Sequence, residues 1–196
     1  MAIIFGPDWQ RDLWASRYRL RFELSQGGSY VNMFTQAYDR ARRLARAALP
    51  AEQFVAVIAA FPDASEDRGS AYDLLHEMGV LTIPSEATWT GYVWSGDEED
   101  VEVLPCEHRA VRATWDQADI LLWSNIACDI GVKPKAPVLS KLVDVARGVT
   151  VYAYDDRGMD ITALSAGPIV ELYTRFDAWL LDCDRPRMSE AFEVKA

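Results

Sequence analysis

The stretch VTVYAYDDRGMDITALS, residues 149–165, places a strand-like apolar run on each side of a short charged segment. Polar segments that contain Asp and Gly between two such runs commonly form tight hairpin turns. We therefore predict a β-hairpin in which Asp155 accepts hydrogen bonds from backbone N–H groups. Asp156 and Arg157 are expected to form a type I turn, and Gly158 is expected to have a positive φ.

Turn chemistry does not require Arg157 or Asp160, so these two charges need another explanation. One is an ion-pair network with the arginines of residues 17–24, where Arg19 and Arg21 alternate with apolar side chains on a predicted strand. Another is recognition of a second protein by the cluster. The candidate binding residues of this region are Asp155, Asp156, Arg157, Asp160, Arg19 and Arg21.

The same carboxylates could instead hold Mg²⁺ or Ca²⁺, because hard cations prefer several oxygen ligands. With Arg157 or Arg21 on a phosphate, the cluster would then serve a metal- or nucleotide-dependent enzyme. The adjacent Asp155 and Asp156 would face opposite sides of a regular strand, so they converge only in a turn. We expect the ion-pair network, assign no catalytic residue, metal or cofactor, and keep the enzyme as an alternative.

Periodicity along the rest of the chain predicts an α+β fold. Residues 53–61 are apolar almost throughout, which is typical of a central strand covered on both faces. Asp116 is expected to cap one helix and Pro168 to begin another. Residues 132–137 are interpreted as a linker and residues 182–196 as a peripheral tail. The expected strands are 17–24, 53–61, 88–96, 107–115, 149–154 and 160–165, and the expected helices are 30–49, 71–79, 117–130 and one from residue 168.

These elements predict a single domain over residues 1–196. Its sheet should be mixed but largely antiparallel and packed against about four helices, with a C-terminal β-hairpin followed by a helix. Half of the residues are hydrophobic, which is ample for a packed core.

The charge of the chain is acidic and uneven. Twenty Lys and Arg against thirty Asp and Glu give a net charge of −10, which disfavours nucleic acid and anionic lipid as partners and favours a basic protein. Residues 1–49 have eight arginines and four acidic residues, so this part is basic whereas the remainder is strongly acidic. The two parts could pair within one domain, or an acidic face could bind a cationic protein.

The acidic run of residues 97–100 lies between two predicted strands, so it is expected at a hairpin tip exposed to solvent. It could also contact a partner, together with the nearby Trp94. Core packing is the expected role of the tryptophans in general, with an aromatic binding slot as the alternative. The candidate binding residues of this second region are Trp94, Asp97, Glu98, Glu99 and Asp100.

Few residues suggest catalysis. His76 and His108 lie in no nucleophile or metal motif, and each is interpreted as an ordinary surface or core histidine. The three cysteines are far apart and form no metal-binding spacing, which favours free thiols in a reducing cytoplasm. We find no export signal and no membrane-spanning stretch. The oligomeric state is not indicated.

Three stretches resemble a bacterial family catalogued as domain of unknown function 3885. They are RLRFEL near the start, VYAYDDRGMDI, and LYTRFDAWLLD in the following helix. The specific part of the resemblance is Tyr154 to Asp160 with Trp179 downstream, and the similarity extends over about residues 16–192. Small acidic domains of this kind look like immunity proteins encoded beside polymorphic toxins, which is an argument by association.

The resemblance and the charge together imply a cytoplasmic bacterial interaction protein. We expect an immunity-type protein that binds and neutralises a toxin partner, for instance a basic toxin domain. Two alternatives stay open, namely the metal- or nucleotide-dependent enzyme using Asp155, Asp156 and Asp160, and a structural or regulatory interaction domain in which the cluster only locks the hairpin.

Overall fold

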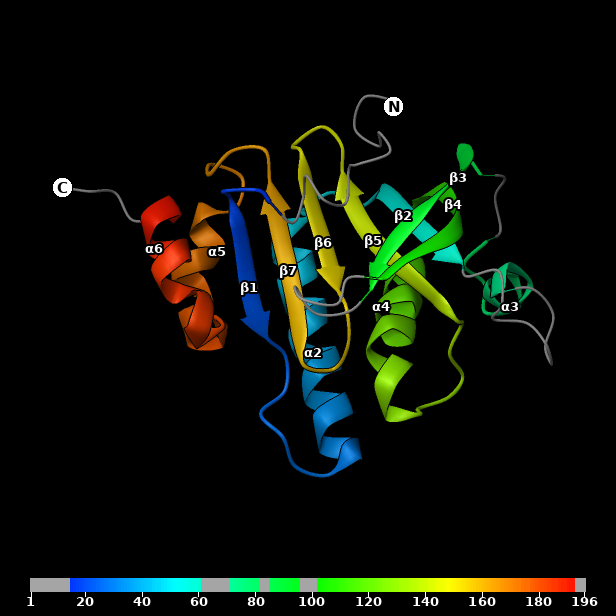
Figure 1. Cartoon of the computed structure of the whole chain (residues 1–196), viewed down its shortest axis with the longest axis horizontal. Coiled ribbons are helices and arrows are strands. Elements are labelled where there is room, and N and C mark those ends of the chain that lie inside the picture. The colour runs from blue at the N-terminus through cyan, green and yellow to red at the C-terminus, as the bar shows by residue number, and fades with distance from the viewer. Residues whose placement is uncertain (1–14, 61–70, 82–84, 96–101, 193–196) are drawn as a thin grey trace.

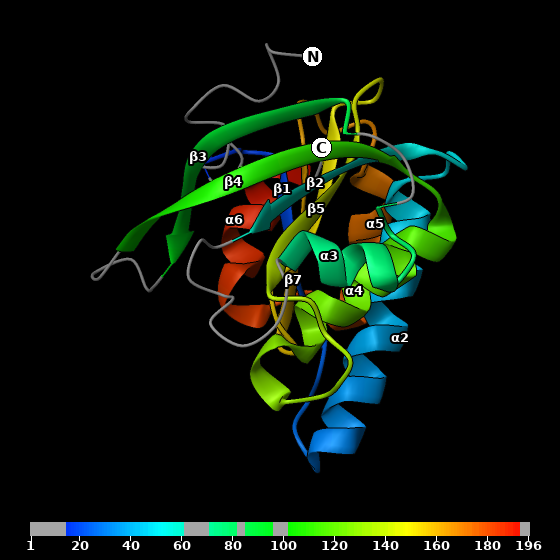
Figure 2. The same cartoon turned by 90° about the vertical axis from the view of Figure 1, so that its right-hand side faces the viewer.

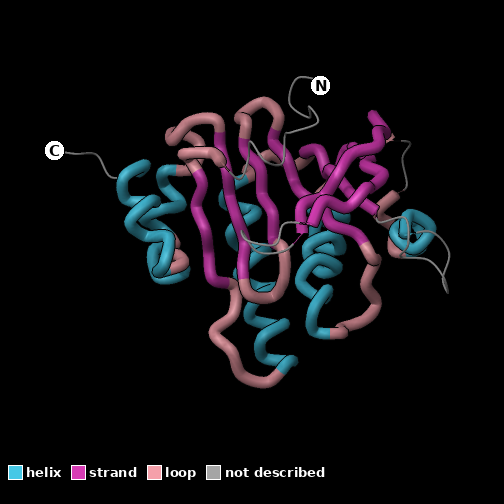
Figure 3. Tube along the Cα trace, viewed as in Figure 1, coloured by secondary structure: helices cyan, strands magenta, loops and turns pink. Residues whose placement is uncertain are grey.

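A computed structural model describes residues 15–60, 71–81, 85–95 and 102–192, and within these ranges the side chains of residues 93–95 and 102–104 are not described (Figures 1 and 3). The strands are β1 (Arg19–Glu23), β2 (Phe54–Ala60), β3 (Ala87–Ser95), β4 (Glu102–Ala113), β5 (Val138–Asp144), β6 (Val149–Ala153) and β7 (Gly158–Ala163). The helices are α2 (Tyr30–Ala48), α3 (Ala71–Glu77), α4 (Trp115–Ile130), α5 (Val170–Arg175) and α6 (Arg185–Phe192), with short 3₁₀ turns η1 (Asp177–Trp179) and η2 (Asp182–Asp184).

The strands form one seven-stranded sheet in the order β1-β7-β6-β5-β2-β4-β3. Every pairing between these strands is antiparallel. This confirms the predicted α+β class and the hairpin of β6 and β7 followed by a helix. β2 lies inside the sheet between β5 and β4, as its apolar sequence predicts.

Helices α2 and α4 cover one face of the sheet (Figures 1 and 2). Alternate residues of the strands point toward these helices, because successive side chains of a strand face opposite sides. They form one apolar core with the helices, which includes Phe22, Met159, Val151, Leu142, Ala56 and Val111. On the opposite face, which we call the helix-free face, no described helix lies over β5, β6 and β7 (Figure 1), and β3 and β4 project to that side of the sheet (Figure 2).

The two central helices begin and end at recognisable caps. α2 begins after Ser29, whose side chain accepts a hydrogen bond from the Asn32 backbone N–H. α4 begins after Thr114 with a capping box to Gln117, and it ends at Gly131 with φ of 67°. The prediction that Asp116 caps this helix is therefore wrong by two residues. The reason is that the Thr-x-x-Gln pair satisfies the exposed backbone groups at Thr114.

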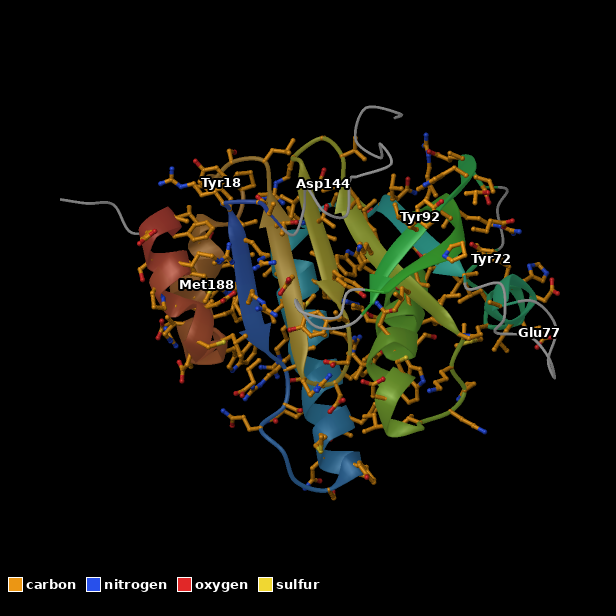
Figure 4. The ribbon with its side chains drawn as sticks, viewed as in Figure 1. Tyr18, Tyr72, Glu77, Tyr92, Asp144 and Met188 are labelled. Atoms are coloured by element: carbon orange, nitrogen blue, oxygen red, sulfur yellow. The ribbon has the colours of Figure 1, made fainter. Side chains whose placement is uncertain are left out.

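β5 was not predicted, because its charged residues interrupt the apolar pattern next to the expected linker. The helix expected from residue 168 is shorter than predicted, since α5 ends at Arg175 and η1 follows. The C-terminal residues were expected to be peripheral, but α6 buries Met188 and Phe192 against the core. Met188 lies beside β1 in Figure 4.

The outer edge of β1 is covered by this C-terminal region. Phe22 forms an isolated β-bridge with Leu180, and the Leu181 N–H donates to the Arg21 carbonyl oxygen at 2.8 Å.

The helices α2 and α4 are joined by Asp119, which accepts from Arg42 at 2.8 Å and from Arg46 at 3.0 Å. Arginines of the basic N-terminal part thus pair with acidic residues of the remainder, as one of the two interpretations of the uneven charge predicts.

Candidate functional site

The helix-free face of the sheet carries a polar row across three strands. Arg21 on β1 lies directly opposite Asp160 on β7, and Asp160 lies opposite Tyr152 on β6. Directly opposite residues on one face of an antiparallel pair have adjacent side chains. Lys141 on β5 faces the same side, because its neighbour Leu142 belongs to the core on the helical side.

Asp160 is the centre of an ion-pair network with the first strand. Its Oδ1 lies 3.2 Å from Nε of Arg21, and its Oδ2 lies 3.8 Å from Nη1 of Arg19. The Asp160 and Arg19 side chains are each 7% exposed. Burial raises the pKa of the Asp160 carboxyl, and the two guanidinium groups oppose that shift. The predicted network between Asp160 and the β1 arginines is therefore present.

The C-terminal region completes this network with two residues that the sequence analysis did not identify. Oδ2 of Asp184 lies 3.4 Å from Nη1 of Arg21 and 3.9 Å from Nη2 of Arg19. Nη2 of Arg187 approaches the same oxygen to 3.6 Å. Three arginines thus share two carboxylates at the edge of the sheet. The alternation of charge in DCDRPR, residues 182–187, could have indicated this role.

Tyr154 lies over Gly158 and reaches β1. A Cβ atom built on Gly158 would lie 1.9 Å from the phenolic oxygen of Tyr154, so only glycine leaves room for the ring. Arg21 donates a side-chain hydrogen bond to this phenol. Burial raises the pKa of Tyr154 to about 12, so the phenol is protonated at neutral pH.

The turn between β6 and β7 is built on Asp155. Its Oδ1 accepts from the backbone N–H groups of Arg157 at 2.7 Å and Gly158 at 3.0 Å, which confirms the predicted role of this aspartate. Its Oδ2 accepts from Nε of Arg157 at 2.8 Å. The predicted positive φ at Gly158 is wrong, because the glycines with positive φ lie elsewhere. Position 158 instead requires glycine because the Tyr154 ring approaches it closely.

Asp156 and Arg157 differ sharply in exposure. Asp156 is 3% exposed, and among the described residues its Oδ2 has no hydrogen-bond partner. Burial raises the pKa of Asp156, and the neighbouring Asp155 raises it further. The Arg157 side chain is 74% exposed, with its guanidinium also 3.9 Å from Asp129. Arg157 is therefore the motif residue most available to a partner.

The strands β5 and β6 separate beside this cluster. Their ladder spans only the pairs from Leu142↔Val151 to Asp144↔Val149. Beyond it, Nδ2 of Asn125 donates to the carbonyl oxygens of Ser140 and Ala153, each at 2.8 Å. This buried amide from α4 therefore occupies the position where the two strands would bond to each other. No motif in the sequence indicated Asn125.

Lys141 follows directly on β5, where the pairing ends. Its Nζ lies 4.6 Å from the centroid of the Tyr152 ring. Burial lowers the pKa of Lys141 to about 7, an effect that Asp160 partly opposes. Sequence reasoning missed Lys141 because β5 itself was not predicted, whereas Tyr152 lies on a predicted strand but belongs to no motif.

Two of the three carboxylates proposed as cation ligands, those of Asp155 and Asp160, are engaged by donors of the protein itself. Asp155 and Asp160 use both of their oxygens on arginine side chains or backbone N–H groups. Within the described ranges, no three His, Cys, Asp or Glu side chains are grouped so that they could hold a metal ion. The geometry therefore gives no support to cation binding by Asp155, Asp156 and Asp160.

The second predicted region is only partly described. Trp94 lies in β3 with its backbone opposite Val103, and its side chain is outside the description. Residues 97–100 lie outside the described residues. The described tryptophans pack in separate places: Trp123 contacts Phe34 with ring centroids 4.5 Å apart, and Trp89 stacks on His108 at 5.2 Å. A common aromatic slot is not formed by these two.

The fold and the cluster thus define an α+β protein with one antiparallel sheet, two central helices and a buried arginine–aspartate network. The family model of the Domain of unknown function (DUF3885) matches residues 7–184, so the chain belongs to this family. Comparison with curated proteins and with solved structures gives no match. Among the described residues, no helix is both long and apolar enough to cross a membrane.

Proposed function

We propose that this protein is an interaction protein of the immunity type, which binds a basic protein partner and neutralises it in the cytoplasm of a bacterium. The observation that carries the proposal is the internal use of the basic side chains. Every arginine of the described residues contacts a carboxylate, a backbone carbonyl group or an aromatic ring of the same chain. The excess of negative charge is then presented by the remaining carboxylates.

Several exposed carboxylates form no ion pair with the described residues. They are Glu52, Glu77, Asp116, Glu171 and Glu190. An excess of exposed carboxylates attracts a basic protein and accelerates its association at low ionic strength. Such a surface suits a partner whose own active surface is cationic, for example one that acts on nucleic acid.

Three of these carboxylates lie on segments that meet around the beginning of α4. The Trp115 indole donates to the Ala51 carbonyl oxygen at 3.2 Å, which places the segment that contains Glu52 beside the start of α4. The Gln117 amide donates to the Val80 carbonyl oxygen at 2.9 Å, which brings the end of α3, with Glu77, to the same side. Glu77 lies at the α3 end of the molecule in Figure 4, far from α5 and α6. We call Glu52, Glu77 and Asp116 the acidic end.

Co-expression tests the proposal directly. The product of each neighbouring open reading frame is expressed in a bacterial host with and without this protein, and growth is followed. We expect at least one neighbour to arrest growth when expressed by itself and to be tolerated when this protein is present. Growth arrest that this protein never relieves, across all toxic neighbours, would contradict the proposal.

The enzyme alternative has less support, because the oxygens of Asp155 and Asp160 are already bonded within the chain. The purely structural alternative accounts for the buried part of the motif. It leaves the exposed guanidinium of Arg157 and the acidic end without a role.

A further inference from the structure

The edge of the sheet farthest from β1 is formed by β3. Among the described strands β4 is its only partner, so one side of the β3 backbone has no ladder (Figure 2). The edge at β1 differs, because the backbone of Leu180 and Leu181 bonds to it. β3 is therefore the sheet edge that the described residues leave open.

Pro105 on β4 identifies the backbone groups of β3 that face outward. It lies opposite Tyr92 and has no N–H, so these two residues cannot exchange a pair of hydrogen bonds. Bonded and non-bonded pairs alternate along an antiparallel ladder, which places Thr90 and Thr88 in the same non-bonded set. The N–H and C=O groups of these two threonines thus point away from β4. Within the part of the chain that the structure describes, they form no hydrogen bond outside the β3–β4 ladder.

The sequence of β3, ATWTGYVWS, lacks the features that prevent a sheet edge from pairing. The strand has nine residues and contains no charged residue and no proline. Natural edge strands are commonly protected by lysine, by proline or by being very short. Thr88 and Thr90 are exposed, and Tyr92 is 57% exposed. Because threonine and aromatic residues also favour strands, β3 has the composition of a strand that pairs on both sides.

We propose that β3 pairs with β3 of a second copy of this chain, antiparallel about a two-fold axis, so that two seven-stranded sheets join into one. Thr90 lies on the axis and faces Thr90 of the second copy, and Thr88 faces Tyr92. Pairs of threonines, and pairs of an aromatic with a β-branched residue, are favourable across strands. This pairing is independent of the proposed function.

The charge of β3 favours this partner over a basic protein. The chain has a net charge of −10, but Ala87–Ser95 contribute nothing to it. A cationic strand would therefore meet no carboxylate on β3, whereas two copies of β3 place no like charges directly opposite each other. Glu107, opposite Thr90 on β4, already pairs with Arg109.

Two-fold pairing also closes the assembly. Each β3 edge is covered by the other copy, and each β1 edge is covered by its own C-terminal region. Neither described edge of the sheet then remains open for further strands, so the expected product is a dimer and not a filament.

Sedimentation equilibrium of the full-length protein tests the pairing. One pair of strands buries little surface, so the dimer belongs to the weak class and is measured between about 10 µM and about 1 mM protein. We expect the average mass to rise from that of one 22.0 kDa chain toward twice that mass. A mass that stays at one chain over the whole range would overturn the proposal.

Charged substitutions at Thr90 test the register. Thr90→Lys places two ammonium groups opposite each other across the axis, and Thr90→Asp places two carboxylates there. Each variant by itself should therefore dimerise at least about tenfold more weakly than wild type. An equimolar mixture of the two variants should recover association, because lysine then faces aspartate. A mixture that associates no better than its separate components would overturn the proposal.

Thr174→Lys on α5 is the matched control, because Thr174 is also exposed and the substitution adds the same charge. It should dimerise like the wild type. All three variants should unfold in urea at the wild-type midpoint, measured where every protein is monomeric, since both threonines are exposed. Equal weakening of the dimer by Thr90→Lys and Thr174→Lys would show that net charge alone controls association, and would overturn the assignment to β3.

Discussion

Gly158 and Tyr154 are in contact across the β6–β7 hairpin, where the tyrosine ring occupies the space that a Cβ atom on residue 158 would need. This contact explains why the charged turn contains glycine although its backbone φ is not positive. It also holds the phenol where the Arg21 side chain can donate to it. The turn, the ring and the first strand are thus one structural unit.

Gly158→Ala should therefore destabilise the protein. The added methyl group displaces the Tyr154 ring, and overpacking of a well-packed site costs about 1–3 kcal/mol. The measurement is the free energy of unfolding in urea. Gly167→Ala is the matched control, because a Cβ there meets no atom within 4 Å. If Tyr154→Ala in the same chain does not relieve most of the cost of Gly158→Ala, the contact is not its cause.

Asp160→Asn should be among the most destabilising single changes on the helix-free face. It leaves Arg19 and Arg21 with Asp184 as the carboxylate that they still share, and removing one member of a buried ion pair costs about 3–5 kcal/mol. Asp182→Asn is the control, because the Asp182 side chain is 91% exposed and pairs with Arg185 at the surface. A loss of stability at Asp160 no larger than at Asp182 would mean that the network contributes little.

Within the turn, loss of the buried Asp155 should reduce stability more than loss of the exposed Arg157. Asp155→Ala removes the acceptor of two backbone N–H groups, for which we expect a loss of about 1–3 kcal/mol. Arg157→Ala removes an exposed side chain and should cost less than about 1 kcal/mol. Unfolding of both variants in urea checks this. A folded Arg157→Ala protein that fails to relieve a toxic neighbour would assign the arginine to partner binding.

The hairpin and its ion pairs could be predicted because their signals are local. Asp155 and the spacing of the two strands follow from turn chemistry, and the arginine alternation on β1 indicates a charged face that needs acids. β5 could not be found in this way, since Lys141 interrupts its apolar pattern and the residues before it are interpreted as a linker. Whether such a segment forms a strand depends on tertiary packing. Here β5 pairs with β2 on one side and is contacted by Asn125 on the other.

The C-terminal residues were missed for a related reason. α6 has a weak apolar pattern. Its two buried residues, Met188 and Phe192, are enough to hold it in place only because no other strand occupies the outer edge of β1, so the C-terminal region can cover it. Asp184 and Arg187 then reach the arginines of β1, a contact between residues more than 160 positions apart. Single-sequence periodicity carries no information about such a pair.

Lys141 should make stability depend on pH. Its pKa is about 7 in the folded protein and near the ordinary value after unfolding, so the unfolded state binds more protons between these two values. Stability therefore rises with pH from about 7 to 10, by up to about 1.4 kcal/mol per pH unit from this group. Lys141→Met removes this dependence, and urea unfolding of both proteins at several pH values measures it. Parallel curves for the two proteins would contradict the low pKa.

Reversal of charge at the acidic end should weaken binding of a basic partner. Glu52→Lys with Glu77→Lys changes two exposed carboxylates that form no ion pair with the described residues, so stability should change little. The matched control is Glu171→Lys with Glu190→Lys on α5 and α6, which alters the net charge equally at the other side of the molecule (Figure 1). With a partner identified by co-expression, we expect slower association for the first variant, and a smaller difference from wild type at higher salt concentration. Equal effects of the two variants would mean that net charge alone, and not the acidic end, attracts the partner.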